Sequence, residues 1–291
     1  MTWLPRLDEA LRDGYLRRLG LPGPPAPSVE TLFALHRAQV ELIPYEAVWV
    51  WLGERRAVAP LESVRHLVRG RGGYCYQLNG ALATLLGWLG FDVRRHVGGV
   101  QGTPDDPVGA TANHLALTVH GLPCDANPGG EWFIDAGLGD GPHEPMPLVA
   151  GAYRQGPFGY ELGPSAAVGG GWRFHADPAM SLVGMDFGLE VAGRHAFDAK
   201  NAWLQTAPES GFVRVLAVFR RDATGIDALR GRVLRRIADT GTSTDLTTSA
   251  DWFAALADVF GLPLSDVDTE RREALWAKVD AAHEAWLAAT Q

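Results

Sequence analysis

The sequence predicts an α+β protein in three parts: a helical bundle over 1–90, a β-barrel over 91–206 and a mixed α/β lid over 207–291. Three observations predict this fold class. Apolar residues recur at helical spacing before Gly90. Short runs of β-branched and aromatic residues, separated by turn residues, follow it. Both patterns occur in the last part, which has no internal repeat.

Helices are expected at four places in the first part. The spacing of apolar residues predicts one helix from Asp8 to Leu19 and a second from Ser28, a typical N-cap, to Val40. A shorter candidate spans Glu62 to Val68. The strongest candidate spans Cys75 to Leu89, because its leucines form one apolar stripe and Gly90 supplies a stop signal.

Short strands are expected after Gly90, because β-branched and aromatic residues gather in brief runs bounded by Gly, Pro, Asn and Asp. Such a succession of strands is typical of a sheet or a small barrel. The predicted strands are Phe91 to Val100, His114 to His120, Trp132 to Asp135, Trp172 to His175 and Leu189 to Ala192.

The last part mixes both kinds of element. Strands are predicted over Phe212 to Phe219 and over Leu229 to Ile237. Ser249 is the predicted N-cap of a helix that ends before Gly261, and a terminal helix is predicted to begin at Thr269.

Composition and charge exclude several classes of function. Of the 291 residues, 46% are hydrophobic and 21% charged, so the chain is expected to fold around a sizeable core. A formal net charge of −8 gives no global positive field, and neither nucleic acid nor membrane is expected as a partner. No stretch approaches the roughly 20 apolar residues of a membrane span. The first residues lack an apolar signal core, so we expect a cytoplasmic protein.

Cys75 is a candidate nucleophile. The two cysteines, Cys75 and Cys124, are too few for a disulfide scaffold or a four-cysteine zinc site. Cys75 follows Gly72 and Gly73, which favour a tight turn with open backbone angles, and a helix is expected to begin directly after them. The positive end of a helix stabilises a thiolate, the form that attacks. The alternative is a small buried core residue.

His114 and Asp135 are candidates for the base and its orienting group. His114 lies in an alternating strand pattern, and Asp135 ends an apolar strand, where a carboxylate is costly to bury unless paired. Taken singly, each has a structural alternative, a satisfied strand histidine or a turn residue. The histidine follows the cysteine by 39 residues (114 − 75) and the aspartate follows by 21 more (135 − 114). This order is typical of papain-like and transglutaminase-like thiol enzymes.

Four blocks of the sequence resemble those of the arylamine N-acetyltransferase family. Arg71 to Asn79 resembles the family signature Arg-Gly-Gly-Tyr-Cys-Phe-Glu-x-Asn. Leu35 to Glu46 resembles its His-x(n)-Ile-Pro-Phe-Glu-Asn block, in which His36 is expected to be structural. Ile134 to Gly139 resembles Val-Asp-Val-Gly-Phe-Gly, and Thr206 to Phe212 resembles Thr-Ser-Pro-x-Ser-x-Phe. The family's helical bundle, β-barrel and α/β lid agree with the predicted elements.

The resemblance implies a role for each candidate. Cys75 is the expected acyl-accepting nucleophile, His114 the base and Asp135 the orienting group, in a core like that of papain and transglutaminase. Acetyl-CoA is the expected co-substrate, with no permanently bound cofactor and no metal. A small-molecule amine, such as an arylamine, is expected to collect the acyl group in a two-step ping-pong reaction. Tyr45, Tyr76 and Leu138 are the expected substrate-binding residues.

The chain departs from the family pattern at three positions near the expected site. Ala47 stands where the family has Asn, Gln77 where it has Glu, and Leu138 where it has Phe. None belongs to the triad, and all three bear on the choice of substrate. Lys200 and Arg220 are further candidates, for contacts with the phosphates of CoA.

Other functions are compatible with the same residues. The family's amide synthase branch releases a polyketide from a carrier-protein thioester by macrolactam formation, and would add an acyl carrier protein as a partner. A transglutaminase-type thiol hydrolase would need an acyl site open to water. A non-catalytic binding module would show ordinary thiol reactivity. A zinc site built from Cys75, His114, Cys124 and His143 lacks the usual ligand spacing.

Overall fold

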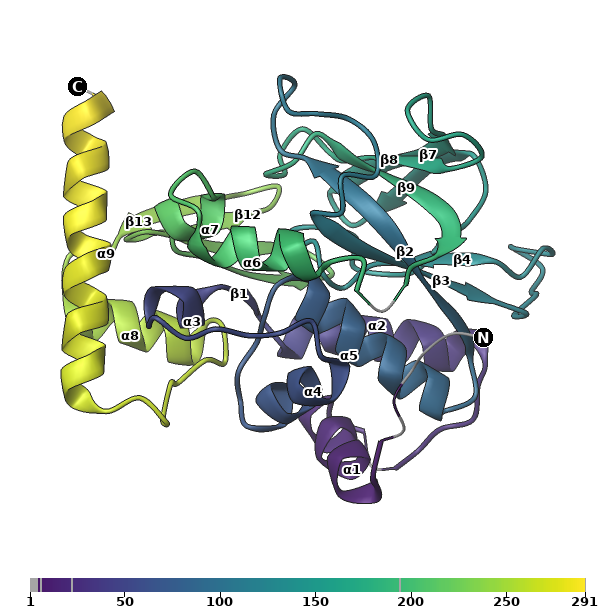
Figure 1. The fold of residues 1–291 in the computed structure, drawn as a ribbon, viewed down its shortest axis with the longest axis horizontal. Coiled ribbons are helices and arrows are strands. Elements are labelled where there is room, and N and C mark those ends of the chain that lie inside the picture. The colour runs from purple at the N-terminus through teal and green to yellow at the C-terminus, as the bar shows by residue number, and fades with distance from the viewer. Residues whose placement is uncertain (1–4, 6, 22, 194, 291) are drawn as a thin grey trace.

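The computed structural model describes residues 5, 7–21, 23–193 and 195–290, which form helices and two antiparallel sheets (Figure 1). The helices are α1 (Glu9–Arg18), α2 (Val29–Leu42), α3 (Val48–Trp51), α4 (Pro60–Val68), α5 (Cys75–Trp88), α6 (Asp198–Thr206), α7 (Gly211–Arg214), α8 (Ser249–Asp258) and α9 (Thr269–Thr290). The strands are β1 (Tyr45–Glu46), β2 (Asp92–Gln101), β3 (His114–His120), β4 (Trp132–Ile134), β5 (Met146–Pro147), β6 (Gly151–Gln155), β7 (Phe158–Pro164), β8 (Trp172–His175), β9 (Gly184–Val191), β10 (Ala217–Asp222), β11 (Gly225–Arg230), β12 (Val233–Ile237) and β13 (Thr242–Asp245).

The helices of the first part begin where their capping residues predict. The side chains of Asp8 and Ser28 accept hydrogen bonds from backbone N–H groups in the first turns of α1 and α2. α5 lies inside the bundle, and every residue from Cys75 to Leu86 is buried. It packs against α4 and against β2 and β3 of the barrel. The start of α5 is therefore held by core packing rather than left on a mobile surface.

The strands β2 to β9 form one eight-stranded antiparallel sheet in the order β5-β4-β3-β2-β9-β8-β7-β6. It curls into a nearly closed barrel, which lies at the upper right of Figure 1, above α2 and α5. The predicted strands His114 to His120 and Trp172 to His175 match β3 and β8 in both bounds. β3 lies between β2 and β4, so the barrel places the start of β3 next to the end of β4.

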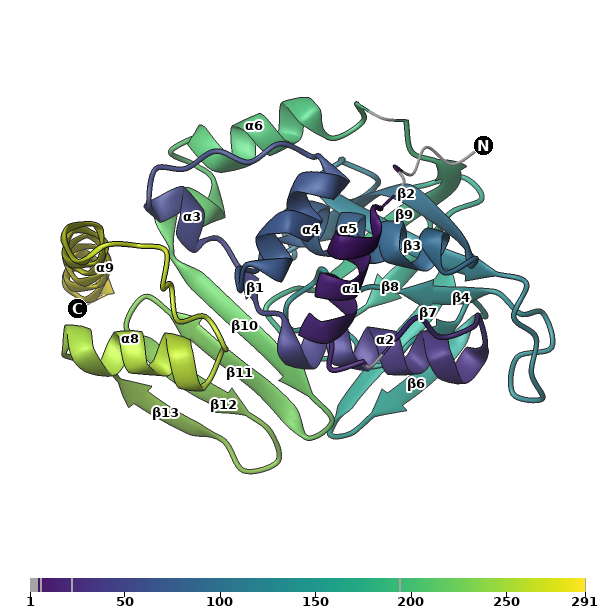
Figure 2. The same cartoon turned by 90° about the horizontal axis from the view of Figure 1, so that it is seen from below.

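A second sheet has the order β1-β10-β11-β12-β13 and combines one strand from the first part of the chain with four strands from the last part. β1 comes from the first part and pairs with β10 through Tyr45 and Phe219 (Figure 2). α8 and α9 pack against this sheet through a core that includes Trp252 and Leu275. The lid is thus fastened by β1 to the segment that precedes the Cys75 helix, and the predicted α+β class is confirmed.

The predicted strand from Phe212 to Phe219 is wrong in its first half. α7 occupies that half, and β10 begins only after it. The side chain of Ser210 accepts a hydrogen bond from the backbone N–H of Phe212 and so caps the helix. The run of apolar residues is compatible with a strand and with a helix, and the Ser210 cap favours the helix.

The predicted strand from Leu229 to Ile237 is two strands. Gly231, with a φ of 56°, turns the chain between β11 and β12, which pair with each other. The helix expected from Ser249 is present, but its N-cap is Thr248, whose side chain accepts from Asp251. Gly231 is the turn signal in the sequence that divides the predicted strand in two.

Several short elements were missed, of which α6 is the most informative, because it lies within the segment 91–206 that was expected to hold only strands. α6 buries the polar side chains of Asn201 and Gln205, and both donate to the carbonyl oxygen of Arg56. Buried polar residues interrupt the apolar periodicity on which the sequence-based prediction depends.

Candidate active site

Cys75 is the first residue of α5, as predicted, and only 3% of its surface is exposed. The backbone N–H groups of a first helical turn have no partner within the helix, so the thiol lies at the positive end of α5. Its Sγ is 3.7 Å from the carbonyl oxygen of Asn113, directly before β3. The nucleophile candidate therefore faces the barrel.

The glycines before Cys75 provide space rather than open backbone angles, so the predicted reason for them was wrong. Neither Gly72 nor Gly73 has a positive φ. A Cβ at Gly72 would lie 2.1 Å from the carbonyl oxygen of Pro44, and Gly73 forms a parallel bridge with Tyr45. The close approach of these two segments is what requires glycine.

Two buried arginines hold the loop that leads into α5. Nη1 of Arg56 donates to the carbonyl oxygen of Gly72 at 2.9 Å. Nε of Arg71 donates to the carboxylate of Asp266 at 3.1 Å, in the loop between α8 and α9. The loop of the nucleophile is thus bonded to the bundle and to the lid.

His114 and Asp135 meet beside Cys75. Nε2 of His114 lies 2.7 Å from Oδ2 of Asp135, and both side chains are buried. His114 begins β3 and Asp135 directly follows β4, and these strands are paired neighbours. Sγ of Cys75 lies against the carbonyl oxygen of Asn113, the residue directly before His114. The structure therefore brings together all three residues predicted for the triad.

The other carboxylate oxygen of Asp135 is held by α5 and by its own loop. Oδ1 accepts from Nδ2 of Asn79 at 2.8 Å and from the backbone N–H of Gly137 at 2.9 Å. Oδ1 of Asn79 in turn accepts from the N–H of Ala136 at 3.0 Å. Every oxygen of this buried carboxylate has a donor, so its orientation toward His114 is fixed.

Charge pairing keeps His114 protonated. Burial lowers the pKa of His114, but the interactions with Asp135 and Cys75 raise it more, to about 10. His114 is therefore a cation at neutral pH. An imidazolium beside a thiol favours the thiolate, which is the form that attacks.

His36, from α2, holds the backbone of Asp135. Its Nε2 accepts the N–H of Asp135 at 3.2 Å, while its Nδ1–H donates to the carbonyl oxygen of His143 at 3.0 Å. Both bonds form only when the ring is neutral and carries its proton on Nδ1. Burial lowers the pKa of His36 to about 4, so this form is present at neutral pH. Sequence reasoning expected a structural role for His36 and did not connect it to Asp135.

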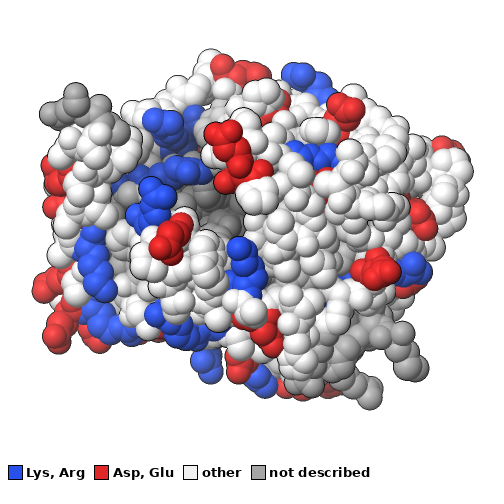
Figure 3. Space-filling view, turned by 45° about the horizontal axis from the view of Figure 1, so that its top comes forward, with Lys and Arg blue, Asp and Glu red and all other residues white. Residues whose placement is uncertain are grey.

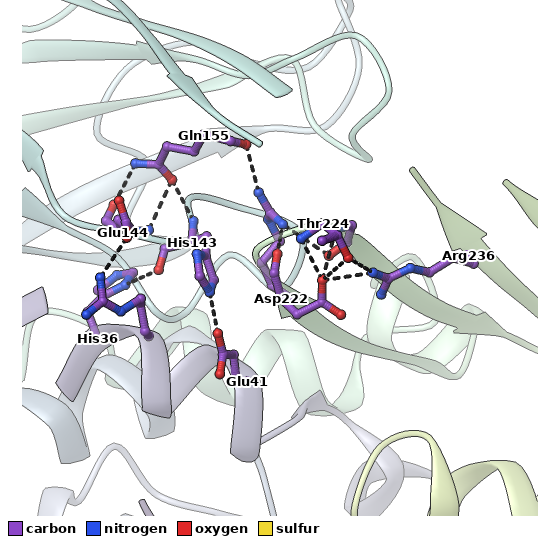
Figure 4. A network of polar contacts seen from close by, with 11 residues as sticks. His36, Glu41, His143, Glu144, Gln155, Asp222, Thr224 and Arg236 are labelled. Carbon is purple, nitrogen blue, oxygen red and sulfur yellow. Dashed lines mark hydrogen bonds and ion pairs between the residues drawn. The ribbon is translucent and has the colours of Figure 1, made fainter. Parts of the chain in front are cut away.

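A polar network surrounds His36 and links three segments (Figure 4). Nε2 of His143 lies 2.6 Å from Glu41 of α2. Gln155, at the end of β6, accepts from the backbone N–H groups of His143 and Glu144. The carbonyl oxygen of Gln155 accepts from Arg221 of β10. Bundle, barrel and lid are therefore bonded together behind Asp135.

The residues expected to bind substrate lie around the triad in different ways. Tyr76 is 1% exposed, and its hydroxyl donates to the carbonyl oxygen of Ala112, so it supports the loop before His114. Leu138 is 8% exposed. Burial, followed by the Cys75 charge, raises the pKa of both Tyr45 and Tyr76, so both phenols lie within electrostatic reach of the thiol.

A cavity of about 770 Å³ lies between the five-stranded sheet and α9. Most of its lining is apolar, but Arg214, Arg230 and Arg235 line it as well and are exposed. Figure 3 shows a hollow bordered by Lys and Arg side chains on this side of the molecule. Within the described part of the chain, none of the three arginines has an ion-pair partner. The cavity therefore suits a ligand that is partly apolar and partly anionic.

One row of paired residues joins this cavity to the triad. Tyr45 pairs with Phe219, Phe219 with Ala228 and Ala228 with Arg235, across β1, β10, β11 and β12. The last three line the cavity, and Tyr45 lies within reach of Cys75. Three strand spacings amount to about 14 Å.

Lys200 and Arg220, the residues expected to contact CoA phosphates, do not line this cavity. Nζ of Lys200 lies 4.3 Å from the ring centre of Trp203. Arg220 lies 3.6 Å from Asp227. Both positive charges therefore interact with neighbouring side chains, Trp203 and Asp227, and not with a ligand in the cavity.

Two kinds of feature are not found among the residues that the structure describes. No group of three or more His, Cys, Asp or Glu side chains is placed to hold a metal ion. Over the same residues, no helix combines the length and the apolar composition needed to cross a membrane.

The structure combines an α+β fold with a cysteine at a helix start, a histidine that begins one strand and an aspartate that directly follows the neighbouring strand. The chain belongs to the N-acetyltransferase family, whose family model matches residues 28–269. It is an enzyme of the arylamine N-acetyltransferase type, and the predicted family and three-part fold are confirmed.

Individual relatives agree with this assignment. The arylamine N-acetyltransferase of Mycolicibacterium smegmatis is 31% identical over 270 residues, which cover 87% of this chain and 92% of that protein. The proansamycin X synthase of Amycolatopsis mediterranei is 29% identical over 152 residues, 51% of this chain and 55% of that protein. The structure of Mycobacterium marinum arylamine N-acetyltransferase in complex with CoA superposes with a TM-score of 0.81 at 26% identity, covering 92% of this chain and 98% of that one.

Proposed function

We propose that the protein transfers an acetyl group from acetyl-CoA to an arylamine or a related amine through a thioester on Cys75. The observation that carries this proposal is the buried contact of His114 with Asp135, 2.7 Å long, beside a thiol at a helix start. Acetyl transfer is also the named activity of the relative that spans most of the chain.

In the first step, the Cys75 thiolate attacks the carbonyl carbon of the donor thioester. A new carbon–sulfur bond forms, the old one breaks, and the departing CoA thiolate takes the proton of the His114 imidazolium. In the second step the amine nitrogen attacks the acyl-cysteine, gives a proton to His114, and Cys75 leaves as a thiolate. Backbone N–H groups at the start of α5 would stabilise the oxyanion in both steps.

The donor would lie in the cavity beside α9. A pantetheine arm is roughly as long as four residues and spans about 14 Å when extended, which matches the row from Tyr45 to Arg235. Its phosphate end would then meet Arg214, Arg230 and Arg235, which have no carboxylate partner among the described residues. Trp286, 55% exposed in the opposite wall, offers a ring on which a nucleobase can stack.

The second candidate function is amide synthesis from a carrier-bound thioester. The match to proansamycin X synthase favours it. In that case an acyl carrier protein would present the phosphopantetheine arm, and no nucleobase would reach Trp286.

The test of the mechanism is intact-protein mass after brief incubation with acetyl-CoA. The native chain and Cys124→Ala should each gain one acetyl group, about 42 Da, and Cys75→Ala should gain none. Cys124 is the matched control because it is the other free cysteine. An acetyl group on Cys75→Ala, or none on the native chain, would contradict the acetyl-CoA mechanism.

The donor site is tested with Arg214→Gln/Arg235→Gln. We expect kcat/KM for acetyl-CoA to fall roughly tenfold or more, because two charge-assisted phosphate contacts are lost. Acylation by S-acetyl-N-acetylcysteamine, which has no phosphate, should be unchanged. Arg94→Gln, half-buried on β2 and paired with Asp92, is the control and should affect neither donor. An equal loss with both donors would argue against phosphate binding in the cavity.

A further inference from the structure

Asp140 is a buried carboxyl group to which the proposed mechanism gives no role. It is 0% exposed, lies in the loop that follows Asp135, and lines the cavity. Its Oδ2 accepts the backbone N–H of Ser181 at 2.6 Å. Its Oδ1 is buried and has no hydrogen-bond partner among the described residues. Since an unpaired buried acceptor is costly, this oxygen is the kind of group that a bound ligand completes.

No described cation neutralises Asp140 by direct contact. Burial raises its pKa, while hydrogen bonds from Ser181 and the more distant charge of Arg230 lower it. The guanidinium of Arg230 instead lies over the ring of Phe219, 5.1 Å from its centre. The position is therefore selective for a donor of hydrogen bonds that fits a mostly apolar wall.

Tyr45 relates Asp140 to the thiol. Tyr45 forms a β-bridge with Gly73, two residues before Cys75, and a Cβ at Gly139, directly before Asp140, would lie 3.0 Å from its ring. The rings of Tyr45 and Phe219 are 5.8 Å apart and meet edge to face. An aromatic acceptor placed along these rings would have one end near Cys75 and the other near Asp140.

We infer that Asp140 is a specificity-determining residue, which selects an acceptor amine with a second hydrogen-bond donor, a hydroxyl or amino group, remote from the reacting nitrogen. This inference rests on the proposed acyl transfer through Cys75. The loop of Asp140 also carries Leu138, where the family pattern has an aromatic residue. The acceptor pocket thus lacks a ring that the family pattern has and contains a buried acid, which favours a directed hydrogen bond over stacking.

The test compares 4-aminophenol with 4-methoxyaniline, which share a ring and differ in the O–H donor. The native protein should prefer 4-aminophenol in kcat/KM. In Asp140→Asn the N–H of Ser181 still requires an oxygen, so the amide turns its NH₂ group to the free side. A donor then replaces an acceptor. The value for 4-aminophenol should fall about 10- to 100-fold, with no loss for 4-methoxyaniline.

The two half-reactions separate this inference from the proposed mechanism. Acylation of Cys75 by S-acetyl-N-acetylcysteamine, a short donor that does not need the phosphate end of the cavity, should be as fast in Asp140→Asn as in the native protein. Asp177→Asn is the control, because Asp177 also accepts backbone N–H groups, from Gly159 and Ala179, but does not line the cavity. An equal loss with both amines, or slower acylation by this short donor, would overturn the role of Asp140.

Binding provides a readout that needs no acyl transfer. Calorimetric titration of Cys75→Ala with the two amines should show tighter binding of 4-aminophenol, and the added Asp140→Asn change should remove the difference. If the native protein is not acylated by acetyl-CoA, the proposed donor fails, while this titration still decides the role of Asp140. Equal affinity for both amines in Cys75→Ala would refute it.

Discussion

The carboxylate of Asp135 is held by residues from three separate parts of the chain. His114 of β3, Asn79 of α5 and the N–H of Gly137 bond its oxygens, while His36 of α2 bonds its backbone. A histidine base works only when its tautomer and direction are fixed. The orientation of His114 therefore depends on α2 as well as on α5, the helix that carries Cys75, and we propose that His36 is a positioning residue for the triad.

We predict that His36→Ala lowers kcat/KM about 10- to 100-fold, because the buried N–H of Asp135 loses its acceptor. His36→Gln, whose side chain can still accept, should recover part of the loss. The rate of Cys75 alkylation against pH is the measurement that separates positioning from mere stability. His96→Ala is the control, since His96 is equally buried but bonds Thr118 and Glu190. An alkylation profile of His36→Ala identical to that of the native protein would contradict this role.

Single residues differ in how far the sequence reveals them. The position of Cys75 at a helix start was predictable, because it follows from local pattern alone. His36 carried a weaker signal: it lies on the buried stripe of α2 with Leu32 and Val40, and a polar residue there needs a buried partner. Asp140 carried none, because a turn carboxylate in a sequence does not show whether the fold buries it.

At the scale of elements, the site depends on how closely α5 and the loop after β4 approach. A Cβ at Gly137 would lie 2.7 Å from Cα of Cys75 and 2.8 Å from Nδ2 of Asn79. Both distances are shorter than real contacts of this kind, and the backbone of Cys75 has no room to move inside a packed helix. Gly137 therefore sets the distance between the nucleophile and Asp135.

Gly137→Ala should destabilise the protein by about 1–3 kcal/mol through overpacking and should abolish most acyl transfer, because it separates α5 from the Asp135 loop. Gly188→Ala in β9 is the matched change, since its new Cβ would meet only Val168 at an ordinary 3.7 Å. Urea unfolding and the acetyl-CoA mass shift are the two measurements. Full acylation of Gly137→Ala would show that the close approach is dispensable.

Elements were predictable where local pattern and final structure agree. The strand from His114 to His120 is buried in all but its last residue and is flanked by clear turns, so its bounds follow from the sequence. The segment from Phe212 to Phe219 is apolar in either conformation, and its first half became α7 through the Ser210 cap. α6 escaped prediction because Asn201 and Gln205 are buried by bonding Arg56, far away in the sequence.

At the scale of the whole molecule, buried neutral histidines link stability to pH. Burial lowers the pKa of His36 and of His96 to about 4, below the ordinary 6.5. The unfolded chain therefore binds protons that the folded chain does not, so this stability is complete above pH 6.5 and is lost as the pH falls toward 4. The contribution of His114 to stability has the opposite dependence on pH. Its pKa is raised to about 10, so the stability that it contributes is complete below pH 6.5 and is lost as the pH rises toward 10.

We therefore predict that the free energy of unfolding is greatest near neutral pH and decreases on both sides. Each neutral histidine should account for a loss on the order of 3 kcal/mol between pH 6.5 and 4. Denaturant unfolding at a series of pH values measures this curve. His96→Gln should make the acid side shallower and leave the alkaline side unchanged, and a parallel displacement of the whole curve would contradict the assignment.

The sequence by itself determined the fold class, the helix that carries Cys75 and the order of cysteine, histidine and aspartate, because these depend on local periodicity, capping and motif. Only the tertiary structure decided which groups meet. Strand pairing brought His114 to Asp135, α2 supplied His36 from 99 residues away in the sequence, and the edge strand β1 joined the lid to the site. Burial, cavities and buried polar atoms without a hydrogen-bond partner depend on how distant segments pack together. The proposed role of Asp140 could therefore be inferred only from the tertiary structure.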